Sequence, residues 1–267
     1  MYPRMIQKIQ GILCYLLIAS CSVTSVQCSD DDSENPENTV PEEDDKSTNC
    51  RPAVLAGAGG LLYVTYNADS TVKLLTSPAY ADVAEYKQEY LYTDGKRTRM
   101  NLYAGGKIIG YSLLTYAATK IIESAYEYMD DQVYQSRYYI HYREGDRIFA
   151  TVDYTVDGRV RYDSVYFTYT NDNITRANGY GANDKILYYN IYEYDASINP
   201  YALLDIRDYQ GLGFLPVSRS KNNITRIEYH YEEYSSTSHY SYTYDENGLP
   251  LTYTDEIQTL NFEYVCN

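Results

Sequence analysis

The side chains with the clearest capacity for chemistry are three histidines and five cysteines. His230 and His239 flank one expected turn, a spacing that a metal pair could use, while His141 stands alone in an alternating stretch. Histidines on a half-exposed strand face more often form surface hydrogen bonds. No Cys-x-x-Cys and no cysteine–histidine cluster accompanies them. We therefore predict no metal site and no cofactor.

No motif indicates catalytic groups. The chain has no Gly-x-Ser-x-Gly and no His-Glu-x-x-His, and no nucleophile is paired with a base in the sequence. Carboxylate pairs such as Asp130–Asp131 and Glu232–Glu233 fall at expected turns, where solvation explains them. A glycosidase built from acids distant in sequence is the alternative. We predict a non-enzymatic protein without catalytic residues.

The first 20 residues have the pattern of an export signal. They carry Arg4 and Lys8, no acid, and an apolar stretch over 12–19 that is too short to span a membrane stably. The run 17–21 (LIASC) resembles the lipobox of bacterial lipoproteins, in which the cysteine is lipidated. We predict a lipoprotein signal peptide over 1–20 and lipidation at Cys21.

Cys28 is the alternative lipidation site. It precedes a serine and three aspartates, which resemble the acid-rich surface-export signal of Bacteroidetes lipoproteins, although Gln27 suits cleavage poorly. Either cysteine makes the membrane a partner, through a lipid anchor. We predict an outer-membrane protein held on the cell surface.

Acidic residues dominate 30–45, with Pro36 and Pro41 among them and almost nothing apolar. Such a segment cannot bury enough surface to fold, so we predict a disordered tether over 21–56. The chain carries a net charge of −15, and nucleic-acid binding needs clustered Lys and Arg instead. Nucleic acid is therefore excluded as a partner.

Tyrosine dominates the rest of the chain. All of the 36 tyrosines except Tyr2 and Tyr15 lie between Tyr63 and Tyr264, and many alternate with polar residues. Tyrosine at every second position favours β-sheet and tolerates water on one face. From Ala79 to Asn199 there is no proline, as expected for uninterrupted strands.

Asp-Gly and Asn-rich pairs separate the tyrosine-rich segments and predict tight hairpins. We predict one β domain over 57–267. Its strands are expected near 61–67, 84–93, 97–103, 107–115, 119–129, 133–142, 147–155, 159–169, 173–180, 185–195, 224–234, 238–245, 249–254 and 258–265.

Residues 196–223 interrupt this meander. Asn199 and Pro200 offer an N-cap and a first-turn proline for a short helix, and an apolar, turn-rich run follows. We predict that this insertion packs against the sheet as a plug or pocket rim. The side chains expected to pack are Tyr201, Leu204, Ile206, Phe214 and Leu215.

Cys50 and Cys266 bracket the expected domain in an exported compartment, where disulfides persist. They could bridge if the first and last strands approach each other, and two free thiols are the alternative.

The order of these features resembles a known group. The hairpin over 242–250 resembles the tyrosine–aspartate (YD) repeat of bacterial surface proteins, and Asn-Ile-Thr-Arg occurs at 173–176 and 223–226. Together with the signal and tether, the order resembles Bacteroidetes surface lipoproteins of unknown function with a porin-like fold. The resemblance implies an all-β antiparallel meander of about 12–15 strands, curled into a single-layer sheet or open barrel.

The resemblance implies no assigned activity. We expect a binding or structural module for a glycan or an envelope protein, and the alternative is a carrier of an apolar ligand inside the curled sheet. Asp69-Ser70-Thr71 and Asp163-Ser164-Val165 resemble the O-glycosylation acceptor of this bacterial group, which predicts modification of Ser70 and Ser164.

Overall fold

The computed structural model describes residues 50–57, 60–79, 84–158, 160–204 and 219–266. Within these residues, no helix is long and apolar enough to cross a membrane. The strands are β1 (Cys50–Gly57), β2 (Gly60–Tyr66), β3 (Val72–Ser77), β4 (Tyr86–Thr93), β5 (Lys96–Ala104), β6 (Lys107–Ala117), β7 (Lys120–Met129), β8 (Gln132–Glu144), β9 (Arg147–Tyr154), β10 (Arg161–Thr170), β11 (Asn173–Gly181), β12 (Ile186–Ile198), β13 (Asn222–Tyr231), β14 (Tyr234–His239), β15 (Ser241–Tyr244), β16 (Pro250–Thr254), β17 (Thr259–Asn261) and β18 (Glu263–Cys266).

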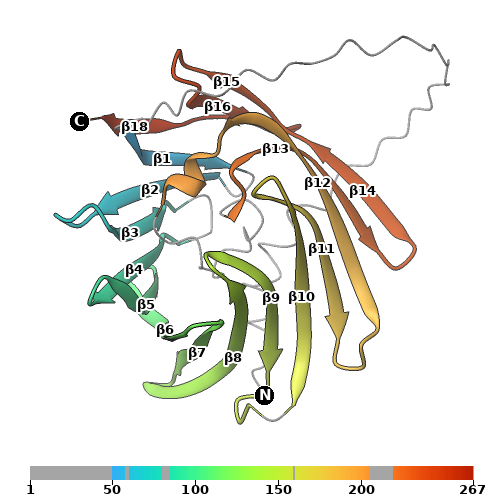
Figure 1. Ribbon diagram of the computed structural model, residues 1–267. Coiled ribbons are helices and arrows are strands. Elements are labelled where there is room, and N and C mark those ends of the chain that lie inside the picture. Colours follow the sequence, from blue (N-terminus) through green and yellow to red (C-terminus); the bar gives the residue numbers. More distant parts are fainter. Residues whose placement is uncertain (1–49, 58–59, 80–83, 159, 205–218, 267) are drawn as a thin grey trace. The chain divides into compact units, whose positions relative to one another are not determined.

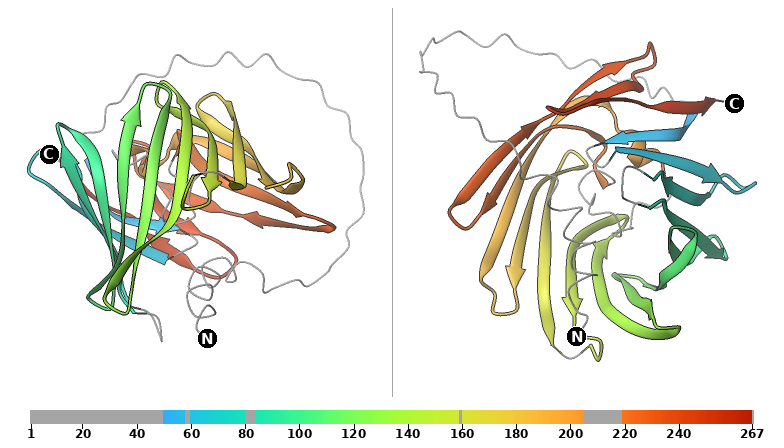
Figure 2. Two further views of the ribbon diagram at one scale, coloured as in Figure 1. Left: turned by 90° about the horizontal axis from the view of Figure 1, so that it is seen from below. Right: turned by 180° about the vertical axis from the view of Figure 1, so that it is seen from behind.

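Fifteen of these strands form one antiparallel sheet. Its order runs from β14 back through β13 to β1 and ends at β18, so that chain neighbours are sheet neighbours throughout the meander. Figure 1 shows the sheet curling around, and Figure 2 shows the same curl from below and from behind. The prediction of an all-β antiparallel meander in a curled sheet is confirmed.

The sheet does not close on itself, because β14 and β18 are its edges. A second sheet of three strands, in the order β15-β16-β17, connects these edges along the chain. Only Tyr240 separates β14 from β15, and only Phe262 separates β17 from β18. The predicted strands at 238–245 and 258–265 are therefore each divided between the two sheets.

The hairpins turn where Asp, Asn and Gly take positive φ. At the β4–β5 turn Asp94 has φ 51° and Gly95 has φ 71°, and at the β10–β11 turn Asn171 and Asp172 have φ 51° and 64°. Glycine, asparagine and aspartate reach this region at little cost, as tight hairpins require. The turns predicted at these positions are confirmed.

Several tyrosines fasten one strand to the next near these turns. Each follows directly after a β-bulge and donates its hydroxyl to a backbone carbonyl at the start of the preceding strand. The pairs are Tyr66 to Pro52 (2.6 Å), Tyr92 to Val72 (2.9 Å), Tyr169 to Ile148 (2.9 Å) and Tyr194 to Ile174 (2.5 Å). These buried or half-buried hydroxyls are thereby satisfied, and they hold the strand ends together.

Two differences from the predicted boundaries concern the start of the sheet. β1 begins at Cys50, inside the range predicted as tether, so the β domain starts earlier than 57. Strand β3 was not predicted at all. Both segments are short and lack a clean alternation, and Pro52 and Gly57 in β1 are residues that usually break strands. The first half of β1 nevertheless pairs with β18, and its second half pairs with β2.

The interruption after β12 contains a short 3₁₀ helix, η1 (Pro200–Leu203). Asn199 caps it, because the Asn199 side chain accepts a hydrogen bond from the Tyr201 amide at 3.0 Å. This is the N-cap and first-turn proline arrangement predicted from the sequence.

Candidate functional site

A row of polar side chains crosses the buried face of β6 to β10. The register places Glu123 opposite Tyr139, Tyr139 opposite Asp153, and Asp153 opposite Asp163. Residues opposite one another in a pair share a face of the sheet, so this face carries a continuous polar row beside the apolar side chains of Leu114 and Ile121. His141 and Thr151 form a second row beside it.

His141 is the centre of a hydrogen-bonded relay. Its Nε2 lies 3.2 Å from Oε2 of Glu123, and its Nδ1 lies 3.0 Å from Oγ1 of Thr151. Burial raises the pKa of Glu123, but the hydrogen bond and charge of His141 outweigh this, and Ser112 and Arg97 add to the lowering. The net pKa of Glu123 lies below its ordinary value.

The relay has the order hydroxyl, imidazole and carboxylate, which activates nucleophiles in acyl transfer. Such a nucleophile must reach a substrate. His141 is 0% exposed and Thr151 is 5% exposed, so neither group is accessible in this arrangement. The relay therefore acts here as a buried polar network that holds three strands, β7 to β9, in register. His141 was expected on a half-exposed face, and its complete burial corrects that expectation.

A second charged group lies beside the relay. Arg137 Nη1 donates to Asp153 Oδ2 at 2.8 Å, and Asp163 stands directly opposite Asp153 on β10. The guanidinium thus pairs with Asp153, and its charge also acts on Asp163. Burial raises the pKa of Asp163, and Arg137 lowers it only in part. The side chain of Asp153 is 8% exposed and that of Arg137 is 38% exposed. The ion pair therefore joins a buried carboxylate to a guanidinium that solvent reaches.

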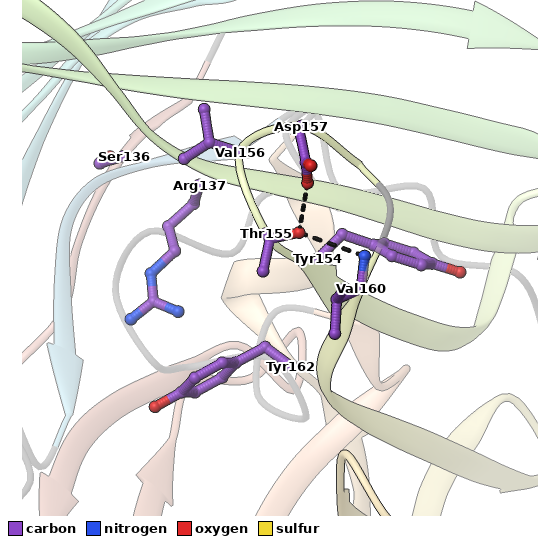
Figure 3. A pocket seen from close by; sticks show the side chains of 8 residues that line it. All are labelled: Ser136, Arg137, Tyr154, Thr155, Val156, Asp157, Val160 and Tyr162. Atoms are coloured by element: carbon purple, nitrogen blue, oxygen red, sulfur yellow. Dashed lines mark hydrogen bonds between the residues drawn. The ribbon is translucent and has the colours of Figure 1, made fainter.

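Arg137 also lines a pocket at the β9–β10 hairpin, with a volume of about 640 Å³. Its guanidinium carbon lies 5.2 Å from the ring centre of Tyr162. Figure 3 shows Arg137 and Tyr162 converging on the hollow, with Thr155 hydrogen-bonded to Asp157 and to the Val160 amide. The lining residues are Ser136, Arg137, Tyr154, Thr155, Val156, Asp157, Val160 and Tyr162.

The free energy of unfolding should depend on pH through the buried carboxyl of Asp153. Burial raises its pKa from 3.8 to about 6, against the lowering by Arg137 and with a further rise from Asp163. A carboxyl whose pKa is higher in the folded chain than in the unfolded chain binds its proton more tightly when folded. Protonation of Asp153 therefore favours folding more as the pH falls from 7 towards 5. The full shift corresponds to about 3 kcal/mol, of which about 1–1.5 kcal/mol is gained between pH 7 and pH 5 and the rest only at lower pH.

We expect the free energy of unfolding of the natural chain, relative to Asp153→Asn, to rise as the pH falls from 7.5 to 5. Chemical denaturation of both proteins across this range measures the difference. A difference that stays constant with pH would contradict the assignment to Asp153.

The residues singled out from the sequence are not gathered at this pocket. Cys50 and Cys266 face each other in the β1–β18 pair and are joined by a disulfide, with Cα atoms 4.0 Å apart. Tyr201 and Leu204 are buried in a cluster with Leu55, and η1 contacts β1.

The remaining predicted positions fall into two groups. Ser70 is exposed in the β2–β3 turn, as an acceptor would need to be. Ser164 is 1% exposed on β10, so the folded chain cannot present it for glycosylation, and that expectation is corrected. Cys21, Cys28, Ile206, Phe214 and Leu215 lie outside the described residues.

Neither the relay nor the Arg137 group is predicted by the sequence motifs above. A signal was present in the alternation: Arg137, Tyr139 and His141 share one face of their strand, and Thr151 and Asp153 share one face of the next. Complementary charges on neighbouring strands of a meander indicate that these side chains lie on the same face of the sheet and contact each other.

The two outer histidines lie away from this site. His230 stacks on Tyr189 with ring centres 4.2 Å apart, and its Nε2 lies 3.3 Å from Glu228. Across the described part of the chain, no group of three or more His, Cys, Asp or Glu is placed to hold a metal ion.

Comparison with known proteins gives little beyond the geometry. No family model and no curated protein matches the chain. Among solved structures, a porin-like protein from Bacteroides uniformis matches with 12% identity and a TM-score of 0.41, over 73% of this chain and 95% of that one. A porin-like protein from Bacteroides vulgatus matches with 13% identity and a TM-score of 0.35, over 82% of this chain and 98% of that one. At such low values, function has to be inferred from the chain's own residues.

Proposed function

We propose that this chain is a non-enzymatic binding module of the bacterial cell envelope, and that the pocket at β8–β10 takes its ligand. The observation that carries the proposal is the convergence of Arg137 and Tyr162 on that pocket. An arginine with an aromatic ring beside an open hollow is typical of recognition sites. The burial of Thr151 and His141 supports binding over catalysis.

The buried face disfavours the alternative of an apolar-ligand carrier. Gln88 and Arg97 on β4 and β5, and Glu123, His141 and Asp153 on β7 to β9, are all buried, at 0–6% exposure. An apolar ligand laid against them would compete with their hydrogen bonds, and an unpaired buried polar group costs about 1–3 kcal/mol.

An array of bacterial glycans and envelope polymers tests the proposal. We expect ligands bound by the natural chain to bind at least tenfold more weakly to Arg137→Met, because the variant loses the guanidinium that lines the pocket. Arg147→Met is the matched control: Arg147 also pairs with an aspartate, Asp172, and lies 5.7 Å from a tyrosine ring, but outside the pocket.

Thermal melts confirm that both variants fold. Equal loss of binding in both, or no ligand at all, would contradict the pocket as the binding site. A lipid that co-purifies with the natural chain in mass spectrometry would favour the carrier instead.

The anchor is part of the same proposal. The lipobox-like run 17–21 supports lipidation of Cys21, with Cys28 as the alternative, and the acidic segment that follows supports surface display at the outer membrane. We expect Cys21→Ala to abolish the lipid adduct and Cys28→Ala to keep it, as measured by intact mass of membrane-extracted protein. Loss of the adduct in Cys28→Ala alone would reverse the assignment.

A further inference from the structure

We propose that the pocket at β8–β10 recognises a neutral sugar unit of a glycan, with the sugar's apolar face on the ring of Tyr162 and its hydroxyls on the guanidinium of Arg137. This inference rests on the proposed function and names the chemistry of the ligand. Three features of the pocket support it: the charge balance around Arg137, the exposure of Tyr162, and the polar groups along the pocket edge.

The charge of Arg137 is already compensated. Asp153 accepts from Nη1 at 2.8 Å, and Asp163 stands directly opposite Asp153. An anionic ligand would have to approach a guanidinium that is already paired with one carboxylate, with a second carboxylate opposite that one, and like charges repel. The guanidinium therefore offers directed donors and no excess positive charge.

Those donors suit hydroxyl and ring oxygens. A guanidinium carries five N–H donors in a rigid plane, and the bond to Asp153 uses the Nη1 arm. The side chain of Arg137 is 38% exposed and points into the hollow (Figure 3). The ion pair with Asp153 fixes the orientation of the plane, so little freedom is lost when a ligand oxygen binds to it.

Tyr162 provides an accessible ring. It is 59% exposed, more than most tyrosines of this chain. The β9–β10 register shifts between Arg161 and Asp163, so Tyr162 is the extra residue of a β-bulge. In regular alternation the side chain of Tyr162 would point to the face away from Arg137. The bulge turns it to the face on which Arg137 lies. An exposed tyrosine ring pairs an apolar face with a hydroxyl, as a sugar ring requires.

Ser136, the residue next to Arg137 in β8, is likewise the extra residue of a β-bulge. The β7–β8 register shifts between Ala125 and Tyr126, which leaves Ser136 without a cross-strand partner in β7. Ser136, Thr155 and Asp157 thus line the pocket with polar atoms around the arginine and the ring. The Ser136 hydroxyl donates to the Ala125 carbonyl at 3.4 Å and the Thr155 hydroxyl donates to Asp157, so their oxygens and the Asp157 carboxylate are offered mainly as acceptors. A polyol carries hydrogen-bond donors and acceptors on every carbon, whereas a lipid chain would use none of these polar atoms.

The test uses titration calorimetry of the full chain with three sets of oligosaccharides: neutral hexose chains, uronic-acid chains and amino-sugar chains. We expect neutral chains to bind, with affinity reduced at least tenfold in Tyr162→Ala and in Arg137→Lys, which keeps the charge but loses the planar fork. Tyr166→Ala is the matched control, because Tyr166 lies on the same strand, is 42% exposed, and packs edge-on against Tyr180 away from the pocket.

The outcomes separate the two proposals. Binding of uronic-acid chains or amino-sugar chains alone, with dependence on Arg137, would overturn the neutral-sugar inference and leave the pocket as a binding site. A protein or polymer ligand that needs Tyr162 would do the same. If no set binds, or if Tyr166→Ala weakens binding as much as Tyr162→Ala, the inference is wrong.

Discussion

Reducing the Cys50–Cys266 disulfide should lower the free energy of unfolding by about 5 kcal/mol. The two cysteines are 216 residues apart in sequence, and closing so long a loop restricts the unfolded chain strongly in the chain-entropy model. The bond also joins β1 to β18, the first and last strands along the chain. Denaturant unfolding with and without a reductant measures the loss.

A double variant, Cys50→Ser with Cys266→Ser, is the control. It should unfold at the same denaturant concentration as the reduced natural chain and should not respond to reductant. If fully reduced protein, verified by mass, unfolds like the oxidised protein, the disulfide does not stabilise the folded chain as we expect.

Breaking the buried relay should have the second largest effect. His141→Ala leaves the Glu123 carboxylate, 7% exposed, without its main partner, and removing one member of a buried pair costs about 3–5 kcal/mol. His230→Ala is a matched control, because His230 lies 3.3 Å from Glu228, much as His141 lies 3.2 Å from Glu123. The His230 pair is about a quarter exposed, so we expect a loss of about 1 kcal/mol, including its ring stacking.

A third protein separates charge burial from packing. Replacing both partners by apolar residues, Glu123→Met with His141→Leu, should recover much of the stability lost in His141→Ala, because neither member of the pair is left buried without the other. Thermal and denaturant unfolding of the three proteins decides. Equal losses in His141→Ala and His230→Ala would show that burial of the relay contributes nothing.

The fold was largely predictable because local signals decided it. Asp-Gly and Asn-Asp pairs mark the hairpins, and alternating tyrosines define the strands between them. The first strands escaped prediction for a physical reason: β1 contains Pro52 and ends at Gly57, and tertiary pairing on both sides overrides these local breakers.

The candidate site was much less predictable. Arg137, Asp153 and Tyr162 come together through cross-strand register, and two bulges set that register locally. One extra residue in a strand exchanges the faces of the side chains beyond it, and the sequence does not mark where such a residue falls. The burial of His141 has the same origin, since it depends on Glu123 and Thr151 from neighbouring strands.

Hydrogen–deuterium exchange of the full chain, with and without the best-binding oligosaccharide from the array, tests the binding site most directly. We predict slower exchange of backbone amides at the residues that line the pocket, which are 154–157, Val160, Tyr162, Ser136 and Arg137. Strand β13, far from the pocket in the sheet order, should not change. Protection confined to β13 or other distant strands, with none at the β9–β10 hairpin, would contradict the assignment of this pocket as the ligand site.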